Sequence, residues 1–370
     1  MYLKHLKLIN FKNYAQANFD FCDKINCFAG LNASGKTNIL DAIYYLSFTK
    51  SYFTNIDARA IKHGETFFAI HGVYQNEMEI KVSVTYKQGE KKTVKFDDKP
   101  YVRLMEHIGR IPLVMISPYD RDLINEGSEV RRKYIDSVIS QFDKTYLSNL
   151  ITYNKALKQR NFLLKKYAES NRVNQAEVEI WNEQLARLGT EIYKKRESFI
   201  QEYLPVFQKY FNLLSQGKEK VNIRYKSDLH QKDAGILLKE SLQDDLRLRY
   251  TTKGIHKDDL HFTIEGHPVK IFGSQGQQKS FVIAMKLAQF EHLKAITDIK
   301  PILLMDDIFD KLDDQRVQQL IQMVKNDEFG QIFITDTQRQ RIEEIFNIID
   351  VKHKIFNIAN GTVVRKNEEG

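Results

Sequence analysis

Both ends of the chain carry short apolar runs, whereas the middle repeats its apolar residues with a helical period. Short runs rich in β-branched and aromatic residues are typical of strands. They predict strands over residues 24–29, 67–74, 78–86 and 92–96, and again over 301–305 and 331–336. Helical patterns follow at 38–46 and from about residue 280, with apolar residues at 281, 282, 285, 287 and 288. The two ends therefore predict an α/β fold.

The stretch from about residue 118 to 215 predicts helices. One apolar stripe consists of Leu147, Leu150, Leu157 and Leu164. A second follows three-, four- and seven-residue steps through Trp181, Leu185, Leu188, Ile192 and Phe199. Stripes of this kind form the seam of a short coiled coil or, as we favour, a plain helical hairpin packed on itself. Pro205 is expected to bend or end the second helix.

The α/β pattern returns after this helical stretch, so we expect both ends of the chain to build one head around an insertion. The predicted limits are 1–117 for the first part of the head, 118–249 for the helical lobe and 250–370 for the second part.

Residues 30–37 form a complete G-x-x-x-x-G-K-[ST] loop between a predicted strand and a predicted helix. Backbone N–H groups of such a loop surround a polyphosphate, its lysine reaches the β- and γ-phosphates, and its hydroxyl ligates Mg²⁺. The strand–loop–helix setting argues against a chance Gly-rich turn. The sequence therefore predicts a nucleoside triphosphate site made by Gly30, Leu31, Asn32, Ala33, Ser34, Gly35, Lys36 and Thr37.

Two adjacent carboxylates, Asp306 and Asp307, follow the apolar run at 301–305. Such a run suits a central parallel strand, at whose carboxyl end the ligands of open α/β sheets bind. We expect Asp306 to hold Mg²⁺ and Asp307 to orient the attacking water, because phosphoryl transfer requires a positioned nucleophile. Taken alone, the pair could equally begin a solvated loop.

A third segment, residues 272–279, places Ser274 and Gly276 before a predicted helix. Free N–H groups and a hydroxyl at a helix N-terminus suit an anion, although a simple helix cap fits the segment taken alone. One subunit has no need of two phosphate cradles. Two facing subunits do, because each can close its serine–glycine loop over the nucleotide of the other.

The charge of the chain favours a polyanionic partner. The 370 residues carry a net charge of +8, with a pI near 9.1. Residues 131–172 hold ten basic residues against three acidic ones, with interleaved tyrosines at 134, 146, 153 and 167. A solvated helix face and a phosphate-tracking surface both fit this stretch.

Other chemistry is not indicated. Cys22 and Cys27 have no partner pair at metal spacing, and the ten histidines form no metal-binding pattern. No run of 18 apolar residues occurs, and we expect reduced thiols, a cytoplasmic protein and no membrane.

The order of these motifs resembles the ATP-binding-cassette heads of SMC and DNA-repair ATPases, and within them the RecF family. The resemblance extends over nearly the whole chain. Further matching segments are residues 3–14, Ser-Pro-Tyr-Asp at 117–120, Arg-Arg-Lys-Tyr at 131–134 and Gly-Ile-His-Lys-Asp-Asp at 254–259. Departures are Lys12 for a family arginine, Phe53 in a Ser-x-Arg position, and Ile255 and Lys257 for Pro and Arg, which predict a looser turn at Gly254.

The resemblance implies a weak, DNA-stimulated ATPase that acts as a switch and uses ATP and Mg²⁺. It also assigns Gln275 and Asp313 to the nucleotide site, beside Ser274 and Gly276. An ATP-dependent homodimer would close on duplex, single-stranded or gapped DNA and help RecO and RecR to load RecA. The alternatives are an SMC-like or nuclease-associated ATPase head, against which the short insertion counts, and a metabolic P-loop kinase, for which no acceptor site is apparent.

Overall fold

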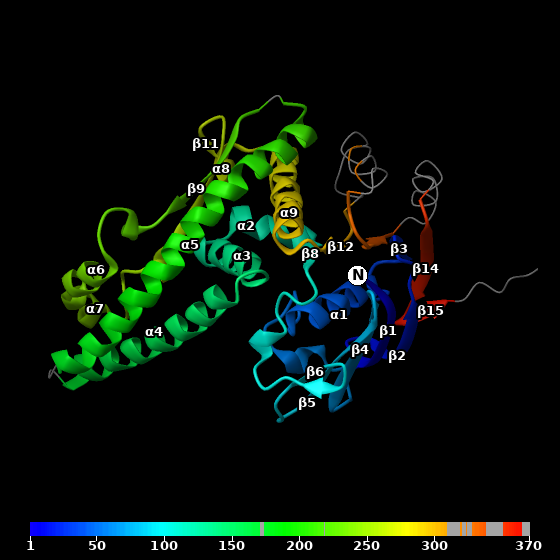
Figure 1. Cartoon of the computed structure of the whole chain (residues 1–370), viewed down its shortest axis with the longest axis horizontal. Helices are drawn as coiled ribbons and strands as arrows, with labels where there is room; N and C mark the ends of the chain where they lie inside the picture. The colour runs from blue at the N-terminus through cyan, green and yellow to red at the C-terminus, as the bar shows by residue number, and fades with distance from the viewer. Residues whose placement is uncertain are drawn as a thin grey trace, which may run out of the picture. The chain divides into compact units, whose positions relative to one another are not determined.

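The computed structural model describes residues 1–170, 174–217, 219–308, 319, 323, 328–337 and 351–364. The chain forms two compact units (Figure 1). The first unit consists of Met1–Asp120 and Met285–Gly370, and the second is Arg121–Ala284. The head is therefore built from both ends of the chain; the domain limits after residues 117 and 249 stay predictions.

One sheet of the first unit is antiparallel, with the strand order β2-β1-β4-β5-β6-β7. Along β4 and β5, buried residues alternate over part of each strand with residues that are half-buried or exposed, as expected of a sheet with one covered face. The strands are β1 (Tyr2–Phe11), β2 (Tyr14–Asp20), β4 (Phe67–Gln75), β5 (Glu79–Lys87), β6 (Thr93–Phe96) and β7 (Lys99–Pro100).

The second sheet of this unit has the order β15-β14-β3-β13-β12-β8. All its pairs are parallel except that of β14 with β15. Every residue of the central strands is buried, which explains why the sequence shows continuous apolar runs there. The strands are β3 (Ile25–Ala29), β8 (Leu113–Ile116), β12 (Ile302–Met305), β13 (Ile332–Asp336), β14 (His353–Ala359) and β15 (Thr362–Val364).

Helix α1 (Lys36–Phe48) packs between these two sheets, touching β1, β4 and β5 of one and β8 and β13 of the other. Because both of its sides are covered, eleven of its thirteen residues are buried. One apolar core joins the helix to both sheets, and stacked and edge-to-face rings, such as Phe28 with Phe333, fill it. The strand that precedes the glycine-rich loop and the helix that follows it are therefore held rigidly.

The second unit is mainly helical. Its helices are α2 (Asp122–Asn125), α3 (Ser128–Ser140), α4 (Lys144–Ser170), α5 (Gln175–Ser215), α6 (Ala234–Glu240), α7 (Leu242–Leu248) and α8 (Val269–Phe272). A small sheet has the order β11-β10-β9, from β9 (Val221–Lys226), β10 (Asp259–Ile264) and β11 (His267–Pro268). Helix α9 (Gln275–Thr297) begins in this unit and ends in the first. Short 3₁₀ turns are η1 (Asp57–Ala60), η2 (Leu104–Glu106), η3 (Pro118–Arg121), η4 (Asp228–His230) and η5 (Ile255–Lys257).

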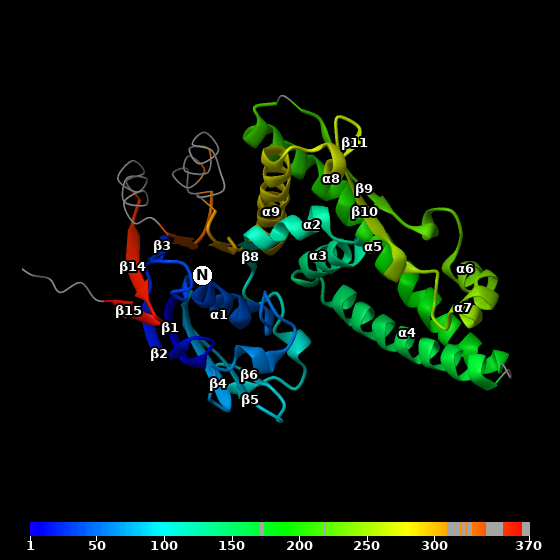
Figure 2. The same cartoon turned by 180° about the vertical axis from the view of Figure 1, so that it is seen from behind.

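Helices α4 and α5 run side by side as the predicted hairpin (Figure 2). The predicted stripe on α5 is confirmed for four of its five members, since Leu185, Leu188, Ile192 and Phe199 are buried, whereas Trp181 is half-buried. On α4 the prediction is mostly wrong, because only Leu164 of the four leucines is fully buried. The main buried stripe there is Tyr146, Tyr153, Arg160 and Tyr167, at seven-residue intervals.

Pro205 does not end α5, which continues to Ser215. Proline removes one backbone hydrogen bond and crowds the preceding turn. Buried Tyr203, Phe207 and Phe211 hold the helix on both sides of it, so packing outweighs the local preference.

Candidate nucleotide-binding site

The glycine-rich loop joins β3 to α1, and its glycines occupy positions that other residues could not adopt. A Cβ on Gly30 would lie 2.2 Å from the carbonyl oxygen of Ile358. Gly35, the residue immediately before α1, has φ of +113°. The predicted strand–loop–helix arrangement is therefore present, with the first N–H groups of α1 following the loop directly.

The ammonium group of Lys36 is held inside this loop. The residue is only 4% exposed, and its Nζ donates hydrogen bonds to the carbonyl oxygens of Gly30 (2.7 Å) and Leu31 (2.9 Å). An ammonium group has three N–H donors, so one remains for a further acceptor.

The next residue, Thr37, connects the loop to the adjacent carboxylates. Its hydroxyl donates to Oδ1 of Asp306 at 2.8 Å, although 269 positions separate the two in sequence. Asp306 follows β12, is 3% exposed, and burial raises its pKa above the ordinary value. A buried carboxylate beside a hydroxyl offers the oxygen ligands that Mg²⁺ prefers.

Thr335, on the neighbouring strand β13, organises both carboxylates. Its hydroxyl donates to Asp306 Oδ1 at 2.9 Å and lies 3.3 Å from Asp307 Oδ1. The backbone N–H of Asp307 donates to the same hydroxyl at 2.8 Å. Sequence analysis missed Thr335; the available signal was a hydroxyl residue near the carboxyl end of a second buried strand, at the same edge of the sheet.

The turn between β1 and β2 supports the loop from one side. The Asn13 side chain donates to the carbonyl oxygen of Ser34 at 3.1 Å, and the Tyr14 hydroxyl donates to that of Gly35 at 3.1 Å. From the turn between β14 and β15, the N–H of Gly361 donates to Ser34 as well, at 2.9 Å. The loop therefore depends on two segments from opposite ends of the chain, which its own sequence does not reveal.

The departures Lys12 and Phe53 occur together in this region. Lys12 Nζ forms an ion pair with Asp41 of α1 at 2.6 Å and lies 5.0 Å from the centre of the Phe53 ring. Asp41 is one helical turn beyond Thr37, so Lys12 joins the β1–β2 turn to the helix that carries the site.

The serine–glycine segment lies in the second unit, before and within the first turn of α9. Ser274 and Gln277 form a reciprocal cap: the Ser274 N–H donates to Gln277 Oε1 at 2.6 Å, and the Gln277 N–H donates to Ser274 Oγ at 3.2 Å. Ser274 and Gln275 are exposed, and Gly276 is half-buried. The helix cap that the sequence allowed is thus present, and the Ser274 hydroxyl proton is not used by it.

The structure brings Lys36, Thr37, Asp306 and Asp307 together within the first unit. Ser274, Gln275 and Gly276 belong to the second unit. Asp313, which the resemblance assigned to the site, lies outside the described residues.

The interpretation of residues 131–172 as a basic surface with interleaved aromatic rings is wrong for the aromatic residues. Tyrosines 134, 146, 153 and 167 are all buried. Three of the arginines are used internally: Arg131 pairs with Asp259, Arg132 donates to the Asp258 carbonyl and Arg160 is fully buried. Arg172 lies outside the described residues, and the exposed cations of α4 include Lys155, Lys158, Lys165 and Lys166.

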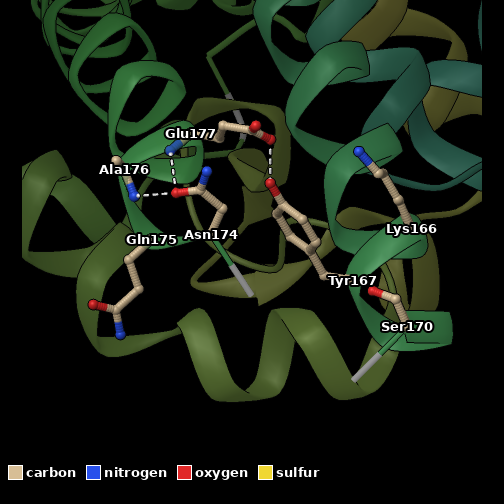
Figure 3. A pocket seen from close by; sticks show the side chains of 7 residues that line it. All are labelled: Lys166, Tyr167, Ser170, Asn174, Gln175, Ala176 and Glu177. Atoms are coloured by element: carbon tan, nitrogen blue, oxygen red, sulfur yellow. Dashed lines mark hydrogen bonds between the residues drawn. The ribbon is translucent and has the colours of Figure 1, made fainter. Parts of the chain in front are cut away.

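An open hollow of about 700 Å³ lies at the tip of the α4–α5 hairpin (Figure 3). Three of the polar side chains that line it bond to one another or to the backbone of α5. Asn174 Oδ1 accepts the N–H groups of Ala176 and Glu177, and the Tyr167 hydroxyl donates to the Glu177 carboxylate. These bonds cap α5 and join the ends of the two helices, so Asn174, Tyr167 and Glu177 have a structural role here.

Two other kinds of feature concern membranes and metal ions. Within the part of the chain that the structure describes, no helix is long and apolar enough to cross a membrane. Among the same residues, no three His, Cys, Asp or Glu side chains gather as a ready-made metal site.

Known proteins resemble this chain over nearly its whole length. Residues 2–360 match the family described as the RecF/RecN/SMC N-terminal domain. The DNA replication and repair protein RecF of Flavobacterium johnsoniae is 50% identical, over 97% of this chain and 100% of its own length. RecF of Phocaeicola vulgatus is 47% identical, over 100% of this chain and 99% of its own.

Solved structures of RecF also resemble this chain. Structures of the recombination mediator protein RecF of the RecFOR pathway, one with ATP and one with ATPrS, have TM-scores of 0.89 and 0.87. Both are 32% identical and cover 98% of this chain and 97% of theirs. An Smc head bound to the C-terminal winged-helix domain of ScpA is 14% identical, covers 98% of this chain and 96% of its own, and has a TM-score of 0.57, which supports the fold alone.

These likenesses confirm the predicted fold class, an ATP-binding-cassette head with a helical insertion. The chain belongs to the RecF family of DNA replication and repair proteins, within the RecF/RecN/SMC group of ATPases.

Proposed function

We propose that this chain is an ATP-driven switch that closes as a homodimer on duplex or gapped DNA. Together with RecO and RecR it would help to load RecA, in keeping with the RecFOR pathway named for its solved relatives. The observation that carries the proposal is the cluster of Thr37, Asp306, Thr335 and Asp307 directly after the Lys36 loop. This cluster supports phosphoryl chemistry on a triphosphate.

ATP with Mg²⁺ is the ligand that these residues fit. The Thr37 hydroxyl and the buried Asp306 carboxylate would hold the metal, since both are hard oxygen donors. Mg²⁺, when bound, neutralises charge on the phosphates. The backbone N–H groups of residues 30–37 would surround the same phosphates.

The remaining residues have separate tasks. Lys36 exchanges its bonds to the Gly30 and Leu31 carbonyls for phosphate oxygens, and so senses an occupied site. Asp307, fixed by Thr335, orients the attacking water. Because ATP hydrolysis is slow without DNA, bound ATP acts as a switch between two states of the protein and does not support rapid catalysis.

Dimerisation follows from the serine–glycine segment. Ser274 is exposed, and its hydroxyl proton is available to a phosphate oxygen of the nucleotide on the partner subunit. Gln275 and Gly276 add N–H groups at the same helix end, and Asp313 completes the set by resemblance.

The test is sedimentation of the protein with and without ATP, repeated with a DNA duplex. A dimer that forms with ATP and co-sediments with DNA is expected. A protein that stays monomeric with ATP and binds DNA weakly contradicts the proposal and favours a metabolic kinase, and ATP-dependent dimers that carry nuclease activity with a partner favour a nuclease-associated head.

A further inference from the structure

Residues 249–258 join α7 to β10 and contain the Gly-Ile-His-Lys segment that the nucleotide site does not use. Two threonines fix the start of this loop. The N–H and hydroxyl of Thr251 both donate to Asn161 Oδ1, at 2.8 and 2.7 Å. The N–H and hydroxyl of Thr252 both donate to Asp245 Oδ1, at 2.8 and 2.6 Å. Two successive residues are thus held by side chains of α4 and α7.

The end of the loop is held equally firmly. His256 is bonded through one ring nitrogen to the Tyr153 hydroxyl at 2.8 Å and through the other to the Thr251 carbonyl at 3.0 Å. Buried Arg196 donates to the carbonyl of Ile255 at 2.8 Å. Gly254 has φ of +125°, and a Cβ there would lie 2.8 Å from the Tyr153 hydroxyl. The looser turn expected from Ile255 and Lys257 is therefore wrong, because side chains from beneath the loop fix its shape.

The charges under the loop are paired within the protein. Arg160 pairs with Asp245 at 2.7 Å, and Arg196 pairs with Asp136 and Asp258 at 2.8 and 3.0 Å. A partner of this loop therefore meets the exposed side chains and not the buried arginines.

The exposed side chains are basic, with one aromatic ring among them. Lys257 Nζ lies 4.7 Å from the centre of the Tyr250 ring, which is 42% exposed. Arg249, Lys158 and Lys165 are also exposed. Lys158 and Lys165 stand three residues before and four after Asn161, so they share the face of α4 on which Thr251 is anchored.

Within the described part of the chain, none of these four cations forms an ion pair. By contrast, Lys232 and Lys239 of the same unit pair with Glu240 and Glu179. We call Lys158, Lys165, Arg249, Tyr250 and Lys257 the loop surface.

We propose that the loop surface contacts the sugar–phosphate backbone of duplex DNA. Unpaired cations beside an exposed ring suit a polyanion, and a backbone fixed by buried bonds loses little conformational entropy on binding. A duplex suits such a loop, because its phosphates keep a regular spacing that fixed cations can match. The inference rests on the proposed DNA-binding function and adds to it the surface that carries the contact.

The experiment compares two variants with the same change in charge. The test variant combines Lys158→Gln, Lys165→Gln, Arg249→Gln and Lys257→Gln. The matched control combines Lys133→Gln, Lys194→Gln, Lys232→Gln and Lys239→Gln, all surface lysines of the second unit that have carboxylate partners. Fluorescence anisotropy with a labelled blunt duplex, in the presence of ATP, is measured across a salt series.

The test variant should bind DNA at least about tenfold more weakly at low salt. The slope of log affinity against log salt concentration should fall by about 3 to 4, since each phosphate contact contributes roughly 0.9. The control should retain affinity and slope, and ATP-dependent dimerisation should be unchanged in both.

Equal losses in the two variants would reduce the effect to net charge and overturn the inference. Wild-type affinity in the test variant would overturn it as well, while leaving the proposed function intact. If the wild-type protein binds no duplex, both the inference and the proposed DNA-binding function are contradicted. Loss of binding to poly-glutamate with unchanged DNA affinity would reassign the surface to an acidic protein.

Discussion

The Lys36 ammonium lies 2.7 Å from the carbonyl oxygen of Gly30, the first residue of the same loop. The lysine therefore stabilises the loop before any phosphate arrives, and the same group is needed opposite the triphosphate. Lys36→Ala should weaken ATP binding by roughly 100-fold, because charge-assisted hydrogen bonds are among the strongest in proteins. Calorimetric titration checks this, with Lys62→Ala as a control in the same unit. Normal ATP affinity in a folded Lys36→Ala protein would contradict the site.

Asp307 has a separate role from Asp306, which is why its amide variant is informative. Asp307→Asn preserves the N–H bond to Thr335 while removing the carboxylate that orients water. ATP should bind normally and turn over roughly 100-fold more slowly, so that dimers accumulate. Phosphate release and light scattering measure the two effects. Unchanged hydrolysis would assign the role to another residue.

The exposed position of Ser274 allows a test of assembly alone. Ser274→Arg should leave ATP binding by the monomer nearly intact and block ATP-dependent dimerisation, because the larger side chain fills the space needed by the opposing γ-phosphate. DNA affinity with ATP should fall with it, as two linked surfaces would no longer act together. Light scattering beside ATP titration is the measurement, and Lys270→Arg is a control on the preceding exposed helix. A variant that still dimerises would count against the two-subunit site.

His256 makes the second unit sensitive to acid. Burial lowers the pKa of His256 from 6.5 to about 4. Between these two pH values the imidazole is protonated in the unfolded chain but neutral in the folded chain. The contribution of neutral His256 to the free energy of unfolding is complete above pH 6.5 and is lost as the pH falls towards 4. At pH 5 this residue alone should cost about 2 kcal/mol of the free energy of unfolding.

Urea unfolding at pH 7 and pH 5 checks that dependence. In His256→Gln, the difference in the free energy of unfolding between pH 7 and pH 5 should be smaller by about 2 kcal/mol. The variant His63→Gln, at an exposed histidine, should show the same pH dependence as the wild type. An identical pH dependence in all three proteins would show that His256 is not the responsible group.

The parts of the fold that were predictable are those whose signals are local. Strands β3, β12 and β13 appear as apolar runs because both faces of a parallel sheet are covered, and the loop after β3 carries its chemistry within eight consecutive residues. The adjacent carboxylates were found because they directly follow such a strand.

The parts that were not predictable depend on residues distant in the chain. Asn13 and Gly361 support the glycine-rich loop from segments more than twenty and three hundred residues away, and neither segment by itself indicates a contact with that loop. The interpretation of the α4 tyrosines as a stacking surface for nucleic acid is wrong because it rests only on their alternation with basic residues. Their seven-residue spacing, which indicates a helix interface, was the better guide.

The heptad stripe of α4 also limits how the hairpin can change. Its four members end in polar groups with four different partners: Tyr146 with Asp136, Tyr153 with His256, Arg160 with Asp245, and Tyr167 with Glu177. Slipping α4 by one heptad against its surroundings would bury similar apolar area yet separate these four groups from their partners, at about 1–3 kcal/mol each. Only one position of α4 against its neighbours therefore satisfies all four. Residues added to the two helices beyond Tyr167 leave all four bonds in place, whereas an insertion between Tyr146 and Tyr167 would break some of them, so the hairpin can lengthen at its tip but not along the stripe.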